Sequence, residues 1–424
     1  MSIRRSIYGL FLLAAVASGQ CGIERWAVKT GADVDAGSVS TNDTTPTTVA
    51  TLASLAAPAS LPAARRILPT ETTTFILNAT LTDYKLEDDS DYHLVLSDSA
   101  GKTMIVEIPH PKCVAAGSPF TAGIANARSQ FDGRLKATDS FQTANILVQV
   151  KGVGFFDFLH GQRGVAPNGI ELHPVLDIVF GPAVTSINTA GGFPDIAPNT
   201  WIEIKGANLA PLNVAAAGVT WGSAPEFATG RMPAQLAGVS VKLNGKAAYV
   251  YYVSPNQINV LTPLNLETGP VTVVVTNGAA SAPPFNSIVR ATAPSFLRFT
   301  GGKHVAATHA DGSLLGPATL SVPGYAFSPA HPGEIIVLYA TGFGLPEATL
   351  NEGSATQFGA LPSLPAIRIG GLSAEVQFAG VVSPGLYQMN VVVPAGAAGG
   401  DNIVTADYAG FTTPAGAVIA VRQP

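Results

Sequence analysis

The chain has 424 residues, of which 47% are apolar and 12% charged, and its formal net charge is −5. This length favours two to four domains, and the apolar fraction excludes a disordered chain. The 44 Gly and 32 Pro are scattered along the sequence, which predicts short strands joined by tight turns and few long helices. We therefore expect a mainly β protein.

Residues 1–20 have the pattern of a secretion signal. Arg4 and Arg5 form a charged start, residues 8–17 an apolar run, and Ala15-Val16-Ala17 a small-residue cleavage site. No later segment approaches the roughly 18 uninterrupted apolar residues of a membrane span, so none is expected. The sequence thus predicts a protein that is secreted or held in the periplasm or cell envelope.

Two cysteines are present, Cys21 and Cys113. In an oxidising compartment they predict one disulfide that ties the mature N-terminus to the first domain, and two unpaired thiols are the alternative. Lipoprotein anchoring at Cys21 is disfavoured, because residues 18–20 match poorly the Leu-led, small-residue box that such processing requires.

Residues 21–70 are expected to form an extended lead-in. A short charged opening at 24–29 is followed by a run rich in Thr, Ala, Ser and Pro, without hydrophobic alternation. Such a segment should be ordered only where it packs on the next domain, with Trp26 as its anchor.

Residues 71–181 are predicted to form a compact barrel. The predicted strands are 73–85, 92–97, 103–108, 145–158 and 172–180, and the predicted helix is 120–135. Three strands, a helix and two strands follow one another in an OB-fold, a five-stranded barrel with Greek-key connections. Gly152 and Gly154 are expected to let the long fourth strand bend.

The charge of this predicted barrel disfavours nucleic acid as a partner. Residues 70–181 hold 8 Lys and Arg against 13 Asp and Glu. Although OB-folds often bind oligonucleotides or oligosaccharides, a polyanion requires a basic track for its phosphates, and this segment has the opposite sign.

The C-terminal half contains a repeated motif. The pattern Gln-x-Asn-Val-x-x-Pro occurs at 257–263 and again at 388–394, each time shortly after a Ser-Pro pair. Short alternating strands separated by turn residues surround both copies, which predicts two tandem immunoglobulin-like sandwiches, residues 182–292 and 293–424. The predicted fold class is therefore an OB-like barrel with one helix, followed by two immunoglobulin-like β-sandwiches.

Several motifs are shared with known families. In the C-terminal half they are LAGVSV at 236–241, SPNQINV at 254–260, ATGFG at 340–344 and GLYQMNV at 385–391. Through them residues 182–422 resemble the Solibacter uncharacterised C-terminal domain family of exported bacterial proteins, and the opening of the first copy is similar to the IPT/TIG class of immunoglobulin-like domains. The barrel segment resembles another uncharacterised exported bacterial group through DYHLVL at 91–96, GVGFFD at 152–157 and GIELHP at 169–174. These resemblances imply an export-associated module without an assigned activity.

Two amide pairs are candidate binding residues. Gln257 with Asn259, and Gln388 with Asn390, stand two positions apart, so each pair projects from one face of its strand. They could bind a glycan or peptide through hydrogen bonds. The structural alternative is favoured, because recurrence in both copies fits a requirement of the fold, with the amides satisfying the Ser-Pro turn or the junction between copies.

Histidines of the predicted barrel are weaker candidates for metal ligands. His93, His160 and His173 could gather with nearby carboxylates, since His and carboxylates are common ligands of divalent metals. No local ligand spacing supports such a site, and alternation places His173 and Asp177 on the solvated face of the last strand. The acidic run 87–91 is expected to be a solvated turn, because it lacks the pattern of a calcium loop.

The sequence has no familiar catalytic signature, such as a Gly-x-Ser-x-Gly elbow, a His-Glu-x-x-His helix or a phosphate-binding glycine loop. The leading hypothesis is an exported, monomeric, non-enzymatic binding or spacer protein of the cell envelope or exterior, without a cofactor, that recognises a glycan or a protein. The alternative is a hydrolase with a metal-assisted site on the barrel, in which His93, His160 or His173 takes part.

Overall fold

The computed structural model describes residues 21–299, 302–320 and 324–422. The segment 1–20, where a signal peptide is expected, lies outside these described residues. The protein is mainly β, with 43% strand and 10% helix, as expected from the sequence. It divides into two compact units, Met1–Ile146 with Val150–Ile178, and Leu147–Gln149 with Val179–Pro424.

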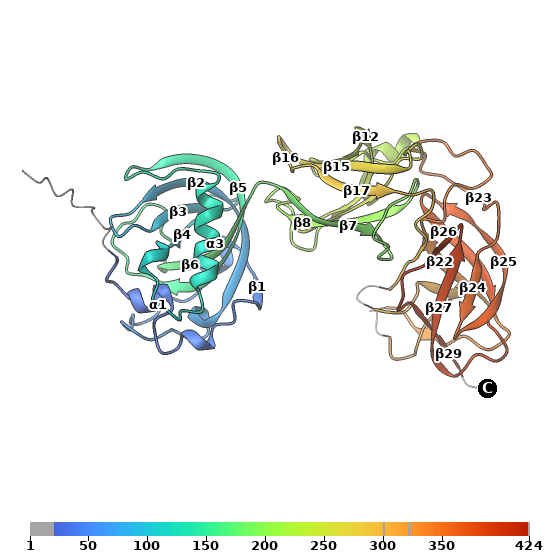
Figure 1. Ribbon diagram of the computed structural model, residues 1–424, viewed down its shortest axis with the longest axis horizontal. Coiled ribbons are helices and arrows are strands. Elements are labelled where there is room, and N and C mark those ends of the chain that lie inside the picture. The colour runs from blue at the N-terminus through green and yellow to red at the C-terminus, as the bar shows by residue number, and fades with distance from the viewer. Residues whose placement is uncertain (1–20, 300–301, 321–323, 423–424) are drawn as a thin grey trace, which may run out of the picture. The chain divides into compact units, whose positions relative to one another are not determined.

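Five strands of the first unit close into a barrel (Figure 1). They are β2 Thr74–Leu86, β3 Tyr92–Ser97, β4 Thr103–Ile108, β5 Gln142–Phe156 and β6 Ile170–Phe180, and the helix α3 Thr121–Asp132 connects β4 to β5. The strand order is β2-β3-β4-β6-β5, and β5 pairs with β2 to close the ring. Strands β4 and β6 run parallel, with Val106 opposite Leu172. This order confirms the OB-like barrel.

The barrel helix α3 buries the apolar stripe predicted for it. Ile124, Ala127 and Phe131 are all fully buried, at spacings of three and four residues. The helix ends at Asp132, three residues earlier than predicted, because Gly133 follows and glycine costs about 1 kcal/mol in a helix interior.

The two glycines of β5 allow close packing. A Cβ atom at Gly154 would lie 2.4 Å from the carbonyl oxygen of Thr70, and one at Gly152 would lie 2.9 Å from Leu172 Cβ. Larger side chains are therefore excluded where β5 passes its neighbours.

The lead-in is folded, in contrast to the extended segment expected. It contains the helices α1 Trp26–Thr30 and α2 Val49–Ala53 and the strand β1 Thr44–Pro46. Strand β1 adds to the barrel sheet by pairing in parallel with β2, with Thr45 opposite Phe75.

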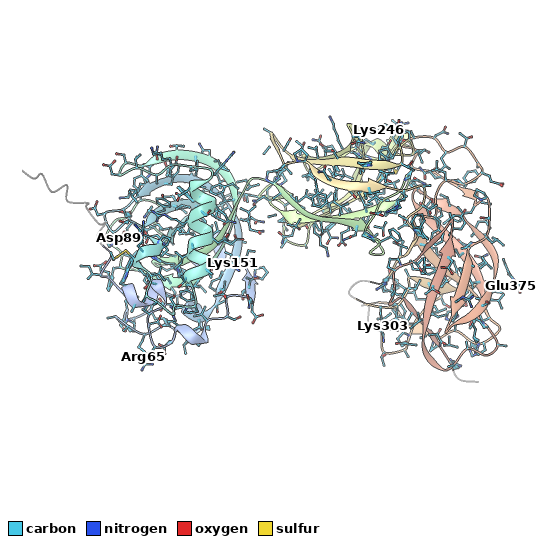
Figure 2. All side chains as sticks on the ribbon, viewed as in Figure 1. Arg65, Asp89, Lys151, Lys246, Lys303 and Glu375 are labelled. Carbon is cyan, nitrogen blue, oxygen red and sulfur yellow. A yellow bond between two sulfur atoms is a disulfide. The ribbon has the colours of Figure 1, made fainter. Side chains whose placement is uncertain are left out.

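One buried ion pair joins the lead-in to the barrel segment, and a second lies within the lead-in. Arg25 Nη1 lies 2.6 Å from Glu71 Oε1, and Arg66 Nη2 lies 2.7 Å from Asp33 Oδ2, with these side chains at most 1% exposed. Arg65, by contrast, is exposed and labelled at the surface in Figure 2. These guanidinium–carboxylate pairs add to the packing of the few buried apolar residues of the segment, such as Val28, Val49 and Leu52.

A disulfide also fixes the lead-in. Cys21 and Cys113 are bonded, with their Cα atoms 5.7 Å apart, as the sequence predicts. Cys113 ends a short 3-10 turn, Pro111–Cys113, that follows β4. The bond therefore joins the start of the lead-in to the barrel.

The first sandwich consists of two sheets that face each other across an apolar core. One sheet holds β7 Ala183–Thr189, β8 Trp201–Ala207, β14 Gln257–Leu261, β13 Tyr249–Val253 and β9 Val219–Thr220, in that order. The other holds β10 Gln235–Leu236, β11 Val239–Leu243, β12 Lys246–Ala247, β15 Gly269–Asn277, β16 Ala280–Ser281 and β17 Phe285–Val289. Alternate residues of each strand, such as Ile204, Val241, Ile258 and Val273, meet in the core.

In the second sandwich the described strands form one continuous sheet. They are β18 Ser295–Phe296, β19 Ala307–His309, β20 Leu314–Leu315, β21 Phe327–Ser328, β22 Ile335–Thr341, β23 Gly359–Ala360, β24 Ala366–Ile369, β25 Leu372–Ser383, β26 Leu386–Val392, β27 Gly400–Tyr408, β28 Phe411–Thr412 and β29 Val418–Val421. The long strand β25 pairs with β24 through its first residues and with β26 through the rest. Its core is centred on Leu338, Tyr387 and Met389, all fully buried.

The repeated motif occupies the same position in both sandwiches. Strand β14, which carries Asn259, lies between β8 and β13, and β26, which carries Asn390, lies between β22 and β25. All four pairings are antiparallel. The two copies of the motif are therefore central strands of equivalent sheets, which is what a duplicated unit requires.

Hydrogen bonds join the two sandwiches within the second unit. The backbone N–H of Trp201 donates to Thr341 Oγ1 at 3.0 Å, and Tyr249 Oη donates to Glu352 Oε1 at 2.7 Å. The hydroxyls of Thr189 and Ser295 are 2.6 Å apart and buried. In the part of the chain that the structure describes, no helix is long and apolar enough to cross a membrane.

Candidate functional sites

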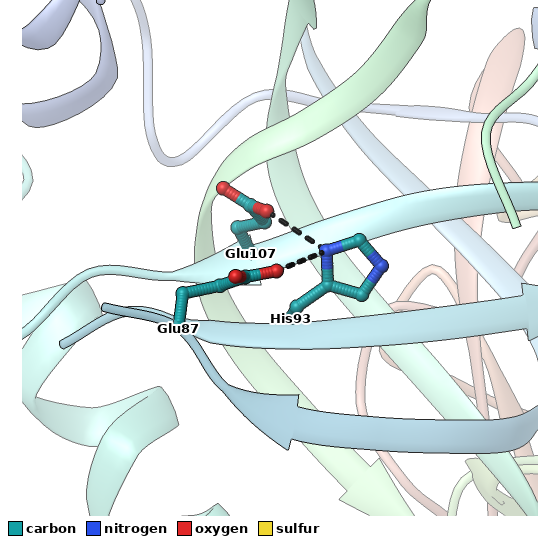
Figure 3. Close-up of side chains that lie close together, drawn as sticks. All are labelled: Glu87, His93 and Glu107. Carbon is teal, nitrogen blue, oxygen red and sulfur yellow. Dashed lines mark hydrogen bonds and ion pairs between the residues drawn. The ribbon is translucent and has the colours of Figure 1, made fainter. Parts of the chain in front are cut away.

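Three barrel side chains with metal-ligating atoms lie together beside a cavity. His93 on β3 and Glu107 on β4 are directly opposite each other in the antiparallel ladder, and Glu87 precedes β3. His93 Nδ1 lies 3.1 Å from Glu87 Oε1 and 3.2 Å from Glu107 Oε1 (Figure 3). Register thus brings the imidazole and both carboxylates together, although Glu87 and Glu107 are 20 positions apart in the sequence.

A second histidine approaches the other oxygen of the same glutamate. His173 Nδ1, from β6, lies 3.0 Å from Glu107 Oε2, and its Nε2 lies 3.5 Å from Asp91 Oδ2. His173 and Asp91 are both 0% exposed. The expected solvated position of His173 is therefore wrong, and Asp91, expected in a solvated turn, is buried as well.

The lead-in explains this burial. Lys29 of α1 contacts Asp157 Oδ2 at 2.9 Å and Glu107 Oε2 at 3.9 Å, and α2 packs against β4. The face of the barrel that carries Glu107 and His173 is thus covered instead of solvated. Alternation in the sequence predicts that one face of β6 is exposed to solvent. In the structure that face is buried at His173.

Burial and neighbouring charges shift the protonation of this cluster. Burial opposes a charged imidazole, but the carboxylates of Glu107 and Glu87 outweigh it and raise the pKa of His93 to about 10. Burial and Lys29 oppose the charge on His173, yet Asp91 and Glu107 raise its pKa to about 9. Although burial alone would raise the pKa of Glu107, the two imidazoles hold it well below its usual range.

The pKa of Glu171, which lies on β6 two residues before His173, is shifted in the opposite direction to that of Glu107. Glu171 is 1% exposed, and burial together with the charges of Glu107 and Asp157 raises its pKa to about 8. Its Oε2 atom has no hydrogen-bonding partner among the described residues. Glu171 is therefore protonated near neutral pH, and the cluster as a whole carries mixed charge.

The cluster opens on a cavity of about 620 Å³ in the first unit. Its wall contains the carboxylates of Glu24, Glu87, Asp88, Asp89, Glu107 and Asp157, and the single ammonium of Lys29. His160 lies on the same wall, where its Nε2 is 3.0 Å from Gln162 Nε2, but it makes no contact with His93. The structure thus brings His93 and His173 to one glutamate and leaves His160 apart, at the rim.

The amide pairs of the two sandwiches bond mainly within themselves. Gln257 Nε2 donates to Asn259 Oδ1 at 2.8 Å and to Glu203 Oε2 at 3.1 Å, and Gln388 Nε2 donates to Asn390 Oδ1 at 2.9 Å. The Ser-Pro turn is satisfied by the backbone of Gln257 instead, whose N–H donates to Ser254 Oγ. Each pair is therefore a two-residue ladder along its own strand.

A β-bulge stands beside each ladder. In β13 the register shifts between Val250 and Tyr252, so Tyr251 is the extra residue opposite β14. In β25 it shifts between Val376 and Phe378, so Gln377 is the extra residue opposite β26. A bulge re-aims its extra side chain, and Tyr251 turns toward aromatic neighbours.

Three aromatic rings surround that point in the first sandwich. The ring centroids of Trp201, Trp221 and Tyr251 are 5.3–5.6 Å apart, each pair being edge to face. Trp201 Nε1 donates to Pro384 O at 2.9 Å. Among the described residues, Trp221 Nε1 and Tyr251 Oη have no such partner.

The aromatic rings line a second cavity of about 320 Å³, here called the aromatic pocket. Its other walls include Asn259 and, from the second sandwich, Leu297 and the segment Ser383–Leu386. Asn259 Oδ1 accepts from Gln257, which leaves its amide N–H groups available. The sequence motif identifies Asn259 as a candidate binding residue. It does not identify the three aromatic residues of the pocket, because they lie at the start of a strand, in a 3-10 turn and on a bulge.

Comparison with protein-family models finds no match, and comparison with curated protein sequences finds none either. Among solved structures, the chain is similar to SGBP-B of the Bacteroides ovatus mixed-linkage glucan utilization locus, in complex with a heptasaccharide, at 11% identity over 68% of this chain and 57% of that one, with a TM-score of 0.25. An auxiliary nutrient binding protein from Bacteroides ovatus matches at 12% identity over 53% and 42%, with a TM-score of 0.16. Domains 5–6 of the S-layer protein SbsC match at 8% identity over 57% and 99%, with a TM-score of 0.19.

The chain therefore spans 57% of the length of the first of these structures. With TM-scores no higher than 0.25, we draw nothing about function from the likeness. The function is therefore inferred from the chemistry of the two cavities.

Proposed function

We propose that this protein is an exported, non-enzymatic carbohydrate-binding protein of the bacterial cell envelope or exterior, and that the aromatic pocket is its glycan site. The disulfide between Cys21 and Cys113 supports an oxidising location outside the cytoplasm. The family resemblance of residues 182–422, which implies export, points the same way.

The observation that carries the proposal is the difference between the two copies of the repeat. The amide ladder is present in both, so it belongs to the fold. Two of the three aromatic side chains are not: the position of Tyr251 is held by Gln377 in the second copy, and that of Trp201, opposite Leu261, is held by Ile335, opposite Val392. Aromatic residues added to one copy of a duplicated frame indicate a purpose beyond folding.

The chemistry of the aromatic pocket suits a sugar. A pyranose ring has faces of C–H groups, which pack on the electron-rich faces of Trp and Tyr, and a rim of hydroxyls that need hydrogen bonds. Trp221 Nε1, Tyr251 Oη and the amide of Asn259 supply such groups beside the rings. The volume of about 320 Å³ falls in the range of about 300–1,000 Å³ that is usual for small-molecule sites.

A glycan array probed with the mature full-length protein tests this function. Binding of at least one oligosaccharide is expected, and calorimetry with that glycan should show at least a tenfold loss of affinity for Trp221→Ala and for Tyr251→Ala. The matched control is Gln377→Ala, the equivalent bulge residue of the second sandwich, which should bind like the parent. The proposal would be overturned if the protein binds no glycan on the array, or if neither aromatic substitution changes the affinity for the glycan that it binds.

A further inference from the structure

We propose that the barrel binds one divalent transition-metal ion of the zinc type through Glu87 Oε1, His93 Nδ1 and Glu107 Oε1, with a fourth position open to the 620 Å³ cavity. This inference is independent of the aromatic pocket, which lies in the other unit. It rests on the spacing of the three ligand atoms, the orientation of the imidazole and the charge of the cavity.

The imidazole nitrogen already has the spacing of a coordination shell to both carboxylate oxygens, and all three ligand atoms lie within 4.8 Å of one another. Around a tetrahedral zinc ion with bonds of about 2.0–2.1 Å, neighbouring ligand atoms are about 3.3 Å apart. His93 Nδ1 lies 3.1 Å from Glu87 Oε1 and 3.2 Å from Glu107 Oε1. An ion could therefore be bound with small adjustments of the two carboxylates (Figure 3).

The imidazole of His93 is oriented as a metal ligand would be. Its Nε2 lies 3.0 Å from the carbonyl oxygen of Arg163, which can only accept, so Nε2 carries a proton. Nδ1 faces the two carboxylates, and a cation on that nitrogen, either a proton or a metal ion, is what allows the three atoms to lie this close. Metal-bound histidines are held in the same way, by a backbone carbonyl on the second nitrogen.

A proton could serve as that cation, but it satisfies fewer of these atoms. A proton on Nδ1 is shared between Glu87 Oε1 at 3.1 Å and Glu107 Oε1 at 3.2 Å, so neither oxygen has it alone. A metal ion would be bound by all three atoms at once. Its preference for an imidazole nitrogen favours a zinc-type ion over calcium or magnesium, which take oxygen ligands.

The cavity favours entry of a cation. Six carboxylates line it, against the ammonium of Lys29 and the imidazole of His93, and that ammonium is already 2.9 Å from Asp157 Oδ2. A cavity lined by one sign of charge concentrates ions of the other sign. The Glu87 side chain is 29% exposed at this wall, which leaves room for a solvent ligand at the fourth position.

The neighbouring group of Asp91, Glu107 and His173 is the weaker choice for an ion. Asp91 and His173 are fully buried and do not line the cavity, and Lys29 Nζ lies 3.9 Å from the Glu107 oxygen that this group would use. His173 Nδ1 lies 3.0 Å from Glu107 Oε2 and its Nε2 lies 3.5 Å from Asp91 Oδ2, so the ring is already paired with both carboxylates of this group. We assign His173 the part of holding Glu107 in place beside His93.

The test is titration of the mature, tag-free full-length protein with ZnCl2 after EDTA treatment and dialysis. Calorimetry should show one ion per chain, and the melting temperature should rise with zinc but not with equal calcium or magnesium. Substitution with Co²⁺ should give the visible absorption bands of a tetrahedral nitrogen and oxygen site. Absence of stoichiometric zinc binding would overturn the proposal.

Matched variants separate ligation from general attraction. Glu87→Gln, at the cavity wall, should lower zinc affinity at least tenfold and remove the Co²⁺ bands, whereas Glu24→Gln, which removes the same charge from the same cavity, should keep both. His160→Ala should also leave binding unchanged. His93→Gln should abolish binding while circular dichroism confirms the fold. Equal losses in Glu87→Gln and Glu24→Gln would mean that the cavity only attracts cations, and would refute the assigned ligands.

Discussion

Tyr251 and Gln377 are the extra residues of two β-bulges that lie at the same place in two copies of one sandwich, each just before the residue that faces the motif asparagine. The bulge is thus part of the duplicated frame, while the residue on it differs. Because a bulged residue is left out of the ladder, its side chain can change without disturbing strand pairing. The first copy uses this freedom for an aromatic ring.

Tyr251→Ala should therefore cost little stability. Its side chain is 38% exposed and contributes to the aromatic pocket rather than to the core, so we expect a loss below about 1 kcal/mol. Ile258→Ala, on the adjacent strand and fully buried, should cost about 2–5 kcal/mol. Urea unfolding of both variants measures the difference, and equal losses would show that Tyr251 belongs to the core.

The buried pair of Arg25 and Glu71 should respond strongly to loss of one partner. Glu71→Gln leaves the Arg25 guanidinium buried without its counter-charge, for an expected loss of about 3–5 kcal/mol. The double variant Arg25→Met with Glu71→Met should recover part of that loss, because no charge remains buried. A double-mutant cycle of Arg25→Met and Glu71→Met by chemical denaturation checks this, and strictly additive losses would contradict the pairing.

Removal of the disulfide should loosen the lead-in. Its cysteines are 92 positions apart, and the loop that they close stabilises the fold by about 4 kcal/mol in the chain-entropy model. Replacing Cys21 and Cys113 by serine together should lower the melting temperature measured by calorimetry. The parent protein heated with a reductant should show the same decrease, and an unchanged melting temperature in both experiments would argue against the expected role.

Glu171 should make stability depend on pH between about 4.5 and 8. Burial and the nearby carboxylates raise the pKa of Glu171 to about 8 in the folded protein. Between these values the unfolded chain loses the proton while the folded chain keeps it, so stability falls as pH rises, by at most about 1.4 kcal/mol per pH unit. Below this range both states are protonated, and the effect disappears.

Glu171→Gln imitates the protonated form and should lack this contribution. Relative to the parent, its melting temperature should therefore rise steadily from pH 5 to pH 8. The exposed Glu375→Gln serves as a control and should follow the parent at every pH. A constant difference between Glu171→Gln and the parent would show that Glu171 ionises normally.

Strand and helix positions in the barrel could be predicted because their side chains alternate. Phe75, Leu77 and Ala79 are buried on β2 as the pattern requires, and β3 and β4 begin and end at the predicted residues. The repeated motif also predicted two sandwiches. In the structure, Asn259 and Asn390 occupy equivalent positions in them. These inferences depend on local periodicity and on identity between copies.

The barrel cluster could not be predicted in the same way. Alternation along the strand predicts that His173 faces solvent. In the structure the lead-in covers that face, and the sequence of the lead-in has no hydrophobic periodicity that would predict this. Lys29 and Asp157 are 128 positions apart, and their contact follows from the tertiary fold. The one local signal was register, since His93 and Glu107 are opposite each other in a hairpin whose strands were correctly placed.

Strand β25 has a mechanical consequence for the second sandwich. It pairs with β24 at its start and with β26 over the rest, and so joins the strands on its two sides into one continuous sheet. Because β25 is hydrogen-bonded to both neighbours, pulling it out of the sheet would break backbone hydrogen bonds to β24 and to β26. Under tension, we expect this domain to resist as a single element and then yield all at once.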